Sequence, residues 1–557
     1  MKRFLPLIAI LLIISSASFA QTNTVGLLSY DPANTFEGYN LMFPHNQPNV
    51  FLLDNCGEVV HTWEDEANFR AGNIAYLRED GTLVKAKRDA NVTDDAIWAG
   101  GGGEFIEIRD WDNNLIWQYE LNNDSFRLHH DIAPMPNGNI LAIAWELKTE
   151  EECLAAGRDT ATTAQDKIWS EYIFEINPTT DQIVWEWHAW DHLIQDFDIT
   201  KANFGVVEDH PELIDVNYDT HNGHPDWLHV NAMDYSELRN QIIISVPYFD
   251  EVWIIDHSTS TQQAAGNFGG LSGGGGDLMY RWGNPVTYTR DTTMQKQLFF
   301  QHDVHFLDEF IDGSNPNFNS IGVFNNRVGS DFSTANIFRP QWDMYTWRYT
   351  FDEGDSQTYF PNDFSLTLTH PEPQKMYSTG LSSFQLLPNG NYLITVGRFG
   401  YTFEMTPDDD IVWEYITPLI GGAAATQGDS LAINNNLTFR MKRYPKGFSA
   451  FEDKDFSETT YIELEPDEMF CDKLLDVEIL EDTYAIEVYP NPAKDFIIVE
   501  WDAGMYTHLD IYNVMGQKIE SIMRTGGRTY LDIAGWEAGM YFIHLEGTKV
   551  AKFIISN

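Results

Sequence analysis

Cysteine is scarce in this chain, and its scarcity limits how the fold can be held together. Only three cysteines occur among 557 residues, Cys56, Cys153 and Cys471. Three cysteines permit at most one disulfide and leave one thiol over, and the sequence does not say which two pair. The fold therefore cannot depend on a framework of disulfides. The chain is long enough to bury a sizeable hydrophobic core instead.

Basic residues are also few. The sequence has 34 lysines and arginines against 84 aspartates and glutamates, which gives a formal net charge of -50. Such a charge repels phosphate backbones and anionic lipid, so nucleic acid and anionic membrane surfaces are excluded as partners. An anionic small molecule would need a locally basic pocket, because the overall field repels it.

Long hydrophobic runs are absent beyond the first residues. A basic start precedes an apolar run from Phe4 to Ile14 and a small-residue end at Ser18–Ala20. This pattern predicts a secretory signal peptide over residues 1–20, with cleavage before Gln21. The run is short for a membrane span. We therefore expect a soluble mature protein, exported through the periplasm and secreted or held at the cell surface.

Sustained helical periodicity is lacking too, and short β-like runs separated by Asn-Gly and Asp-Gly turns take its place. A tryptophan recurs near the end of a strand, at Trp63, Trp117, Trp185, Trp282, Trp347 and Trp413. About four strands fit each interval. Six units of four antiparallel strands predict an all-β fold, with a six-bladed β-propeller over residues 21–470. The alternative is a β-sandwich or solenoid in which the tryptophan spacing is accidental.

The character of the sequence changes near residue 487. Alternating strands follow a Pro-Asn-Pro entry, which predicts a small β-sandwich over residues 487–557 after a linker at 471–486. Its motifs are Tyr489-Pro490-Asn491-Pro492, Tyr512-Asn513 with Gly516-Gln517, Gly539-Met540-Tyr541 and the close at Lys549–Lys552. This segment resembles the C-terminal sorting domain of the type IX secretion system. The resemblance implies that this machinery is a partner, and that the domain is usually removed once the chain has crossed the outer membrane.

Several histidines fall at one position of the repeat. When the units are aligned on the strand before the Asn-Gly turn, His130, His229, His302 and Ser382 occupy similar phases. The innermost strand of a propeller blade lines the central channel, so equivalent positions converge on one site. Converging imidazoles suit a metal site, or a nucleophile with an acid, a base or oxyanion donors. The residues alone leave these alternatives open.

The stretch FFQHDVHFL at residues 299–307 places two histidines inside an apolar strand. Side chains alternate along a regular strand, so His302 shares one face with Val304, and Asp303 shares the other with His305. The repeat phase selects His302 for the channel. We expect His305 to be a packing or supporting group.

Five motifs follow one another in order along the predicted propeller. They are DWLHVN at 226–231, GGDLMYRWGNP at 275–285, QHD at 301–303, FNN at 324–326, and LPNGN at 387–391 followed by FEMTPDDDIVWEY at 403–415. These motifs resemble those of the bacterial aryl-sulfate sulfotransferases, over most of residues 26–418. The resemblance implies an exported six-bladed propeller that moves a sulfuryl group from a phenolic sulfate to a phenol. It implies no nucleotide donor, no other cofactor and no metal.

The same resemblance implies that His302 is the nucleophile and forms a transient sulfohistidine. It implies roles in the sulfate pocket and in proton transfer for His229, His129 and His130. Asn231 is expected to contact the substrate. A hydrogen-bonding partner must also fix the reactive tautomer of the nucleophile, and the candidates are Asp303, Asn231 or a backbone carbonyl.

One position departs from the pattern of the family. A sulfate-binding arginine commonly lies in the strand that matches Ile242–Pro247, and this chain has no arginine there. Arg281, Arg327 and Arg398 are candidate replacements, although exposed and ion-paired arginines are common. The departure keeps two alternatives open. One is a surface propeller that binds a ligand or glycan without catalysis, and the other is a metal-dependent hydrolase that uses the same histidines.

Overall fold

Strands dominate the computed structural model, which confirms the predicted all-β class. The structure describes residues 23–92, 96–159, 161, 167–221, 223–309, 311, 313–352, 354, 357–475, 487–500, 508–514, 517–523, 527–545 and 549–556. The predicted signal peptide and residues 476–486 of the predicted linker lie outside these ranges. The chain divides into two units that make contacts mainly within themselves, Met1–Leu475 and Asp476–Asn557.

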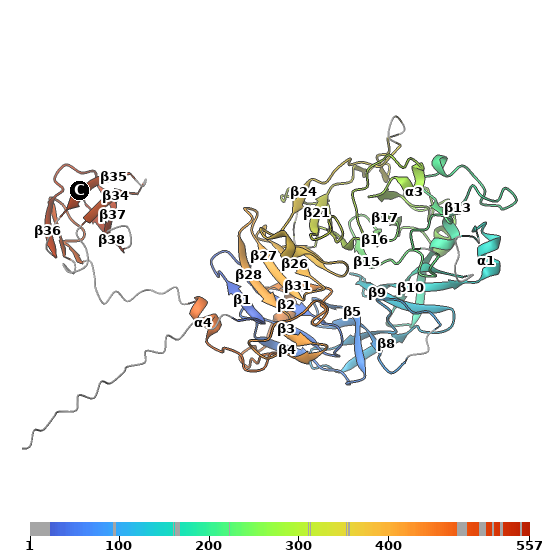
Figure 1. Cartoon of the computed structure of the whole chain (residues 1–557), viewed down its shortest axis with the longest axis horizontal. Coiled ribbons are helices and arrows are strands. Elements are labelled where there is room, and N and C mark those ends of the chain that lie inside the picture. The colour runs from blue at the N-terminus through green and yellow to red at the C-terminus, as the bar shows by residue number, and fades with distance from the viewer. Residues whose placement is uncertain are drawn as a thin grey trace, which may run out of the picture. The chain divides into compact units, whose positions relative to one another are not determined.

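Four-stranded antiparallel sheets repeat along the first unit (Figure 1). The first two are β5 (Phe69–Leu77), β6 (Leu83–Asp89), β7 (Phe105–Arg109) and β8 (Leu115–Glu120), then β9 (Phe126–Pro134), β10 (Ile140–Lys148), β11 (Ile168–Asn177) and β12 (Gln182–His188). The next two are β15 (Ala232–Ser236), β16 (Gln241–Val246), β17 (Glu251–Asp256) and β18 (Tyr280–Trp282), then β19 (His302–Phe306), β20 (Ile321–Asn325), β21 (Thr334–Phe338) and β24 (Leu366–Leu368). Within each sheet the strands lie in chain order.

Two further sheets combine strands from both ends of the unit. β1 (Gly26–Tyr30) pairs with β28 (Ile411–Ile416) at the edge of a sheet that also contains β25 (Ser383–Leu386), β26 (Tyr392–Val396) and β27 (Tyr401–Met405). β31 (Met441–Pro445) pairs with β2 (Gly38–Met42), which continues into β3 (Val50–Leu53) and β4 (Val59–Trp63). In Figure 1 the blue strands β1 and β2 accordingly lie beside orange strands.

The first strands of successive sheets lie next to one another. β9 contacts β5 and β15, β15 contacts β19, and β25 contacts both β19 and β31, while β2 contacts β5. These contacts return to their starting point. The strands predicted to converge are therefore neighbours in the structure. That the sheets are the six blades of a propeller stays a prediction.

The inner strands of the large sheets are buried on both faces, and the alternation of their side chains divides these side chains between two cores. In β16, Ile242 and Ile244 pack into the core shared with the β9–β12 sheet. Ile243, between them, packs into the core shared with the β19–β24 sheet. Successive side chains of a strand point to opposite faces, so an unbroken apolar run is what a doubly covered sheet requires.

Aspartates connect the first strands of neighbouring sheets. Asp131 of β9 accepts a hydrogen bond from the backbone N–H of Met233 at 3.2 Å, and Asp234 of β15 accepts one from Phe306 at 2.8 Å. Asp303 of β19 accepts one from Phe384 at 2.8 Å. Each bond satisfies a backbone donor that the sheet edge would otherwise leave open. The innermost strands are thereby fixed relative to one another.

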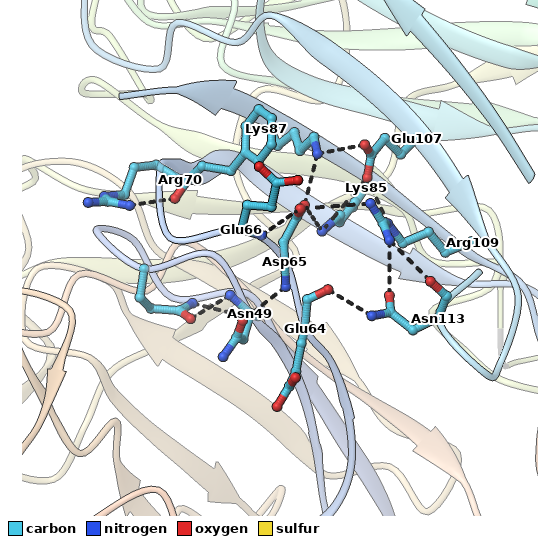
Figure 2. Close-up of polar contacts among 12 residues, drawn as sticks. Asn49, Glu64, Asp65, Glu66, Arg70, Lys85, Lys87, Glu107, Arg109 and Asn113 are labelled. Carbon is cyan, nitrogen blue, oxygen red and sulfur yellow. Dashed lines mark hydrogen bonds and ion pairs between the residues drawn. The ribbon is translucent and has the colours of Figure 1, made fainter. Parts of the chain in front are cut away.

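A buried network of charges joins the β2–β4 sheet to the β5–β8 sheet (Figure 2). Asp65, just beyond β4, lies 2.7 Å from Lys85 Nζ and 2.9 Å from Lys87 Nζ, both on β6. Glu107 of β7 lies 2.6 Å from Lys87 Nζ and also contacts Arg109. Two lysines facing two carboxylates leave no buried charge without an opposite partner, which is the condition for tolerating charges in a core.

Four of the six tryptophan markers lie in the outermost strand of a sheet, a fifth, Trp413, lies one strand in from the edge strand β1, and the sixth lies outside the large sheets. Trp63, Trp117, Trp185, Trp282 and Trp413 belong to β4, β8, β12, β18 and β28. Trp347 lies in the hairpin of β22 (Trp342–Asp343) and β23 (Arg348–Tyr349), and the outermost strand of its sheet is β24. The reading of Trp347 as a strand-end marker was wrong, because this inserted hairpin carries a similar local sequence.

The remaining elements of the first unit are short. They are β13 (Leu193–Ile194) paired with β14 (Ile214–Asp215), β29 (Leu419–Ile420) paired with β30 (Ala423–Ala424), helices α1 (Glu150–Ala155), α2 (Thr261–Ala264), α3 (Val286–Thr289) and α4 (Phe470–Leu475), and single 3-10 turns at η2 (Ala189–His192), η3 (Val207–Asp209), η4 (Pro373–Met376) and η5 (Ser449–Phe451). A disulfide joins Cys56 to Cys471 of α4, and Cys153 is buried and free. No helix in the described ranges is long and apolar enough to cross a membrane.

The second unit consists of two antiparallel sheets around one core. One sheet holds β32 (Glu487–Tyr489), β33 (Phe496–Glu500) and β36 (Arg528–Asp532), and the other holds β35 (Lys518–Met523), β34 (His508–Asn513), β37 (Gly539–Leu545) and β38 (Lys549–Ile555). Side chains of both sheets, among them Ile497, Leu531, Ile511 and Phe553, share the core. The sandwich name remains a prediction.

Candidate active site

Three imidazoles from the first strands of three neighbouring sheets, or from the residues just before them, lie close together. His130 lies in β9, His229 precedes β15, and His302 opens β19. The rings of His130 and His229 stand edge to face with centroids 4.6 Å apart, and Phe300 lies 6.2 Å from His229 and 5.8 Å from His302. All three histidines are buried. We call His130, His229 and His302 the imidazole cluster.

The backbone at the cluster is locally unfavourable. His130 and His229 have φ values of 52° and 55°, and Ser382, predicted to share their phase, has φ of 86°. At the third histidine the left-handed residue is the next one, Asp303, with φ of 56°. Residues other than glycine rarely adopt this conformation, and it costs about 1 kcal/mol or more at each site. Such strain persists only where the surrounding structure imposes it.

The strand at FFQHDVHFL is irregular, yet Asp303 and His305 stay together, with 3.7 Å between Asp303 Oδ2 and His305 Nδ1. The pairing of β19 with β20 shifts register between His302 and His305. Asp303 turns toward the innermost strands, where it pairs with Arg440 at 2.6 Å. His305 packs its half-buried ring against Phe384, with centroids 5.2 Å apart.

The nucleophile candidate His302 is held by an amide. Its Nδ1 lies 2.8 Å from Asn326 Oδ1 and 3.3 Å from the carbonyl of Phe300. Asn326 Nδ2 donates to the carbonyls of Ser378 and Leu381, which fixes Oδ1 as the acceptor. His302 Nδ1 must therefore carry the proton, and Nε2 carries the lone pair. Burial lowers the pKa of His302 to about 3, so the ring is neutral at physiological pH.

His229 is held by a carboxylate instead. Its Nδ1 lies 2.6 Å from Asp226 Oδ2, three residues earlier in the chain. Burial opposes charge on this ring, but the Asp226 carboxylate outweighs it and raises the pKa of His229 above its ordinary value. Burial likewise opposes charge on the partner, yet His229 lowers the pKa of Asp226. Both shifts favour the form of this pair in which an imidazolium faces a carboxylate, and in that form His229 is a cationic hydrogen-bond donor.

His130 is held by another histidine. Its Nδ1 lies 2.9 Å from His129 Nδ1, and His129 Nε2 lies 2.8 Å from Glu171 Oε2 on β11. The His129 ring stacks on Trp145, with centroids 4.1 Å apart and planes 10° apart, which fixes its orientation. Burial lowers the pKa of His129 to about 3 and that of His130 well below its ordinary value. Both rings are neutral.

Arginines approach the cluster from the ends of the second strands. The guanidinium of Arg327, beyond β20, lies 3.5 Å from the centre of the Phe300 ring. Arg398, beyond β26, flanks Gly380 together with His302: a methyl group on Gly380 would lie 3.4 Å from Arg398 Nη2 and 3.7 Å from His302 Cε1. Arg398 Nε is buried and has no hydrogen-bond partner among the described residues. Both groups are available to an anion.

Two other predicted substrate residues have internal partners. Arg281 is fully buried and binds Glu251, Thr287 and the carbonyl of Leu213. Asn231 Nδ2 donates to the carbonyl of Gln301 at 2.8 Å. Arg281 is thus committed to Glu251, whereas the buried Oδ1 of Asn231 has no hydrogen-bond partner among the described residues.

An aromatic layer occupies the place of the missing arginine. Pro247 follows the last residue of β16, and the next residue, Tyr248, places its ring 5.0 Å from His229. Phe300 lies 5.6 Å from Tyr248, with Arg327 on its ring. The surface next to His229 is aromatic, and the guanidinium on it belongs to Arg327 of the neighbouring sheet.

Several residues of the site were not predicted. Asn326 and Asp226 lie inside the motifs FNN and DWLHVN. Asp226 is only three residues before His229 in the sequence, a spacing that could have suggested that it holds this histidine. Glu171 meets His129 across 42 residues of sequence, and nothing local to β11 marks it. His45 was missed as well. Burial, with Arg88 and Arg398 nearby, lowers its pKa to about 4, and its buried Nε2 has no partner in the part of the chain that the structure describes.

No group of three or more histidines, cysteines or acidic residues within the described ranges is arranged to hold a metal ion. What the arrangement offers is a neutral imidazole with a free Nε2, an imidazolium, a neutral imidazole pair and two guanidinium groups. A nucleophile surrounded by cationic and protic donors suits the transfer of an anionic group.

The arrangement can be compared with known proteins. A family model described as Arylsulfotransferase (ASST) matches residues 28–419, and one described as Secretion system C-terminal sorting domain matches residues 487–556. A search of curated proteins found no match. The sorting domain implies export, with a secreted or cell-surface location.

Among solved structures the similarities are low. A protein of unknown function from Bacteroides caccae is 9% identical, with a TM-score of 0.37 over 68% of this chain and 93% of its own. A protein from Lactobacillus plantarum is 9% identical, with a TM-score of 0.34 over 89% and 100%. A structure described as the Dos1 propeller is 9% identical, with a TM-score of 0.28 over 96% of each chain. With the first family model spanning most of its length, this chain belongs to the arylsulfotransferase (ASST) family.

Proposed function

We propose that this protein is a nucleotide-independent aryl-sulfate sulfotransferase that passes a sulfuryl group through His302. The observation that carries the proposal is the contact between His302 Nδ1 and the fixed Oδ1 of Asn326. It leaves the Nε2 lone pair free on a ring that burial keeps neutral, which is the requirement for a nitrogen nucleophile at sulfur.

The reaction has two steps. His302 Nε2 forms a bond to the sulfur of a phenolic sulfate while the sulfur–oxygen bond to the phenol breaks, and the departing phenolate receives a proton. A second phenol then takes the sulfuryl group as its hydroxyl proton is removed. Splitting one transfer in this way restores the free enzyme and needs no other cofactor.

Cationic and protic side chains support the transfer. The sulfuryl oxygens carry negative charge throughout, and the His229 imidazolium, Arg327 and Arg398 are the groups near enough to stabilise it. His130 supplies and recovers the proton of the phenol. The Tyr248–Phe300 layer offers a flat apolar surface to the aryl ring.

We also infer that the six four- and five-stranded sheets of the first unit form a six-bladed β-propeller, over residues 21–470, with the imidazole cluster on its axis. The linker of residues 471–486 and a β-sandwich over residues 487–557 complete the chain. In this architecture the second unit serves type IX export rather than catalysis. Phenolic sulfates and phenols are the small-molecule partners of the first unit.

The test is chemical trapping. Incubation with 4-nitrophenyl sulfate without acceptor, followed by digestion and mass spectrometry, is expected to show a sulfonate adduct on His302. Addition of phenol is expected to discharge it and yield phenyl sulfate. His302→Ala removes the adduct, and His305→Ala is the matched control that keeps it. A wild-type protein that forms no adduct and transfers nothing would reject the proposal.

A second candidate rests on the aromatic layer at Tyr248. A site with an aromatic surface in place of the expected arginine could bind an aryl ligand without turning it over. Ligand binding, measured by calorimetry, that survives His302→Ala while no variant shows turnover would favour this reading over sulfotransfer.

A further inference from the structure

A chain of hydrogen-bonding groups leads from the interior of the β9–β12 sheet to the imidazole cluster. Glu171 Oε2 lies 2.8 Å from His129 Nε2, and His129 Nδ1 lies 2.9 Å from His130 Nδ1. All three side chains are buried. His129 thus has a neighbour at each of its ring nitrogens, and the nitrogen of His130 that is left over is Nε2, on a ring that stands edge to face with His229. We call Glu171, His129 and His130 the relay.

The contacts of Glu171 decide which of its oxygens can hold a proton. Oε1 accepts the backbone N–H of Val230 at 2.9 Å, so it acts as the carbonyl-type oxygen. A proton on the carboxyl group must then sit on Oε2, which faces His129. With that proton in place, His129 accepts at Nε2 and donates from Nδ1, and His130 accepts at Nδ1 and carries its hydrogen on Nε2.

We propose that Glu171 stores the proton that the leaving phenol takes and the acceptor phenol returns, and that His129 passes it to and from His130. The proposal rests on the sulfotransfer proposed above and names the origin of its proton. Glu171 touches no substrate, and it acts only through the two imidazoles.

The proton balance closes over one turnover. In the first step, His130 Nε2–H protonates the phenolate, His129 Nδ1–H moves to His130 Nδ1, and Glu171 Oε2–H moves to His129 Nε2. The bond from sulfur to His302 Nε2 has then formed, and Glu171 is a carboxylate. In the second step the acceptor phenol gives its proton to His130 Nε2, and the same three transfers run backward. Neither His129 nor His130 becomes an imidazolium at the end of a step.

The surroundings favour this arrangement. Burial raises the pKa of Glu171 well above its ordinary value; the nearby Asp226 acts in the same direction, while the Val230 N–H and His229 oppose it. The stack of His129 on Trp145 and the left-handed backbone of His130 hold both rings in the geometry of the chain. A side chain on Gly101 would collide with the His130 ring, because a Cβ there would lie 2.1 Å from Nε2.

Glu171→Gln removes the transferable proton of the side chain while keeping its size and its hydrogen bonds. A glutamine can still accept from Val230 N–H and donate to His129 Nε2, so the rings keep their orientation, but it has no proton to release. Glu175→Gln is the matched control, because Glu175 lies on the same strand β11, is buried, and contacts His257 at 2.9 Å outside the relay. Thermal unfolding of both variants checks that each is folded.

Three measurements follow. With 4-nitrophenyl sulfate, whose leaving group needs no acid, Glu171→Gln is expected to form the His302 adduct within about threefold of the wild-type rate. With phenyl sulfate as donor, or phenol as acceptor, the rate is expected to fall about a hundredfold, the usual size of a proton-transfer contribution. The adduct should therefore accumulate in Glu171→Gln when phenol is added. Glu175→Gln is expected to match the wild type in all three.

An infrared spectrum separates failure of the relay from failure of the sulfotransfer proposal. At neutral pH the wild type and Glu175→Gln should both show a protonated carboxyl band that Glu171→Gln lacks, whether or not any substrate reacts. Absence of that band from the wild type overturns the relay. So does a Glu171→Gln variant that slows both donors equally, or one that discharges its adduct to phenol at the wild-type rate. A wild type that forms no adduct but shows the band rejects sulfotransfer and leaves the stored proton in place.

Discussion

Asp226→Asn is expected to remove the positive charge of His229 while keeping its hydrogen bond. An asparagine can still accept from His229 Nδ1, so the ring stays in place. His302 shows what a buried histidine with an amide partner is like, because its Nδ1 contacts Asn326 and burial lowers its pKa to about 3. We expect the pKa of His229 to fall toward that value, from one that the Asp226 carboxylate now raises above 6.5.

The loss of one charged donor sets the magnitude. His229 is a group within reach of the transferred sulfuryl oxygens, and removal of one such preorganised donor typically lowers the rate about 10²- to 10³-fold. In the wild type, kcat/KM should fall as pH rises through the raised pKa of His229, because the charged form is lost. In Asp226→Asn the His229 ring should be neutral throughout, so the fall of kcat/KM at high pH should disappear. The plot of kcat/KM against pH should then be low and flat between about pH 5 and pH 9, about two units on each side of neutrality.

The assay is the release of 4-nitrophenol from its sulfate with phenol as acceptor, followed across pH. Asp277→Asn is the matched control, because Asp277 lies 2.7 Å from His192 Nδ1 in a pair outside the cluster. An Asp226→Asn variant with the wild-type kcat/KM and the same fall at high pH would refute the assigned charge of His229.

Four further outcomes can be measured. The His229–Asp226 pair should stabilise the fold fully between the two ordinary pKa values of 3.8 and 6.5, because the stabilisation is lost as pH rises through the raised pKa of His229 and as pH falls through the lowered pKa of Asp226. Urea unfolding of Asp226→Asn should therefore show its largest deficit near pH 6, and an equal deficit at pH 10 argues against the pair. Arg398→Met should lower kcat/KM for the sulfate donor about 10- to 100-fold with unchanged unfolding, in keeping with a charge-assisted contact; an unchanged kcat/KM removes Arg398 from the site. Asp303→Asn removes the carboxylate from the Arg440 guanidinium, which keeps its contacts to Asp131 and Tyr76. The free energy of unfolding in urea should fall by about 3–5 kcal/mol. A fall of less than about 1 kcal/mol contradicts the buried pair. Cys56→Ser should lower the free energy of unfolding by about 2–4 kcal/mol with activity kept, and an unchanged melting temperature shows that the disulfide adds nothing.

The class of the fold could be predicted because its signals are local. An apolar run such as Ile242–Ile244 is what a strand covered on both faces requires, and four of the six tryptophans mark outermost strands. Trp347 misled because the β22–β23 hairpin repeats the same local pattern. Nothing in its own sequence distinguishes this hairpin from an outermost strand, and only the pairing of β24 with β21 does so.

The site could be predicted only in part, for a related reason. The phase of the repeat brought out the three histidines, because each lies in or next to the first strand of its sheet. Their different protonation follows from partners that no local pattern marks: Asn326 for His302 and Glu171 for His129, 24 and 42 residues away. The irregularity at Asp303 has the same origin, because Arg440 and Phe384 hold that residue from other sheets.

The mixed origin of two sheets has a consequence for how the chain reaches its native state. Strands β1 and β2 find their partners β28 and β31 almost 400 residues later, at Ile416 and Met441. While the polypeptide emerges from the ribosome or from a translocon, β1 must wait unpaired and β2 can pair only with β3 on one side. Contacts between such distant segments form slowly. Any product that stops short of Pro445 would keep open strand edges, which are templates for joining another chain. Incomplete copies of this protein should therefore aggregate rather than persist as smaller folded pieces.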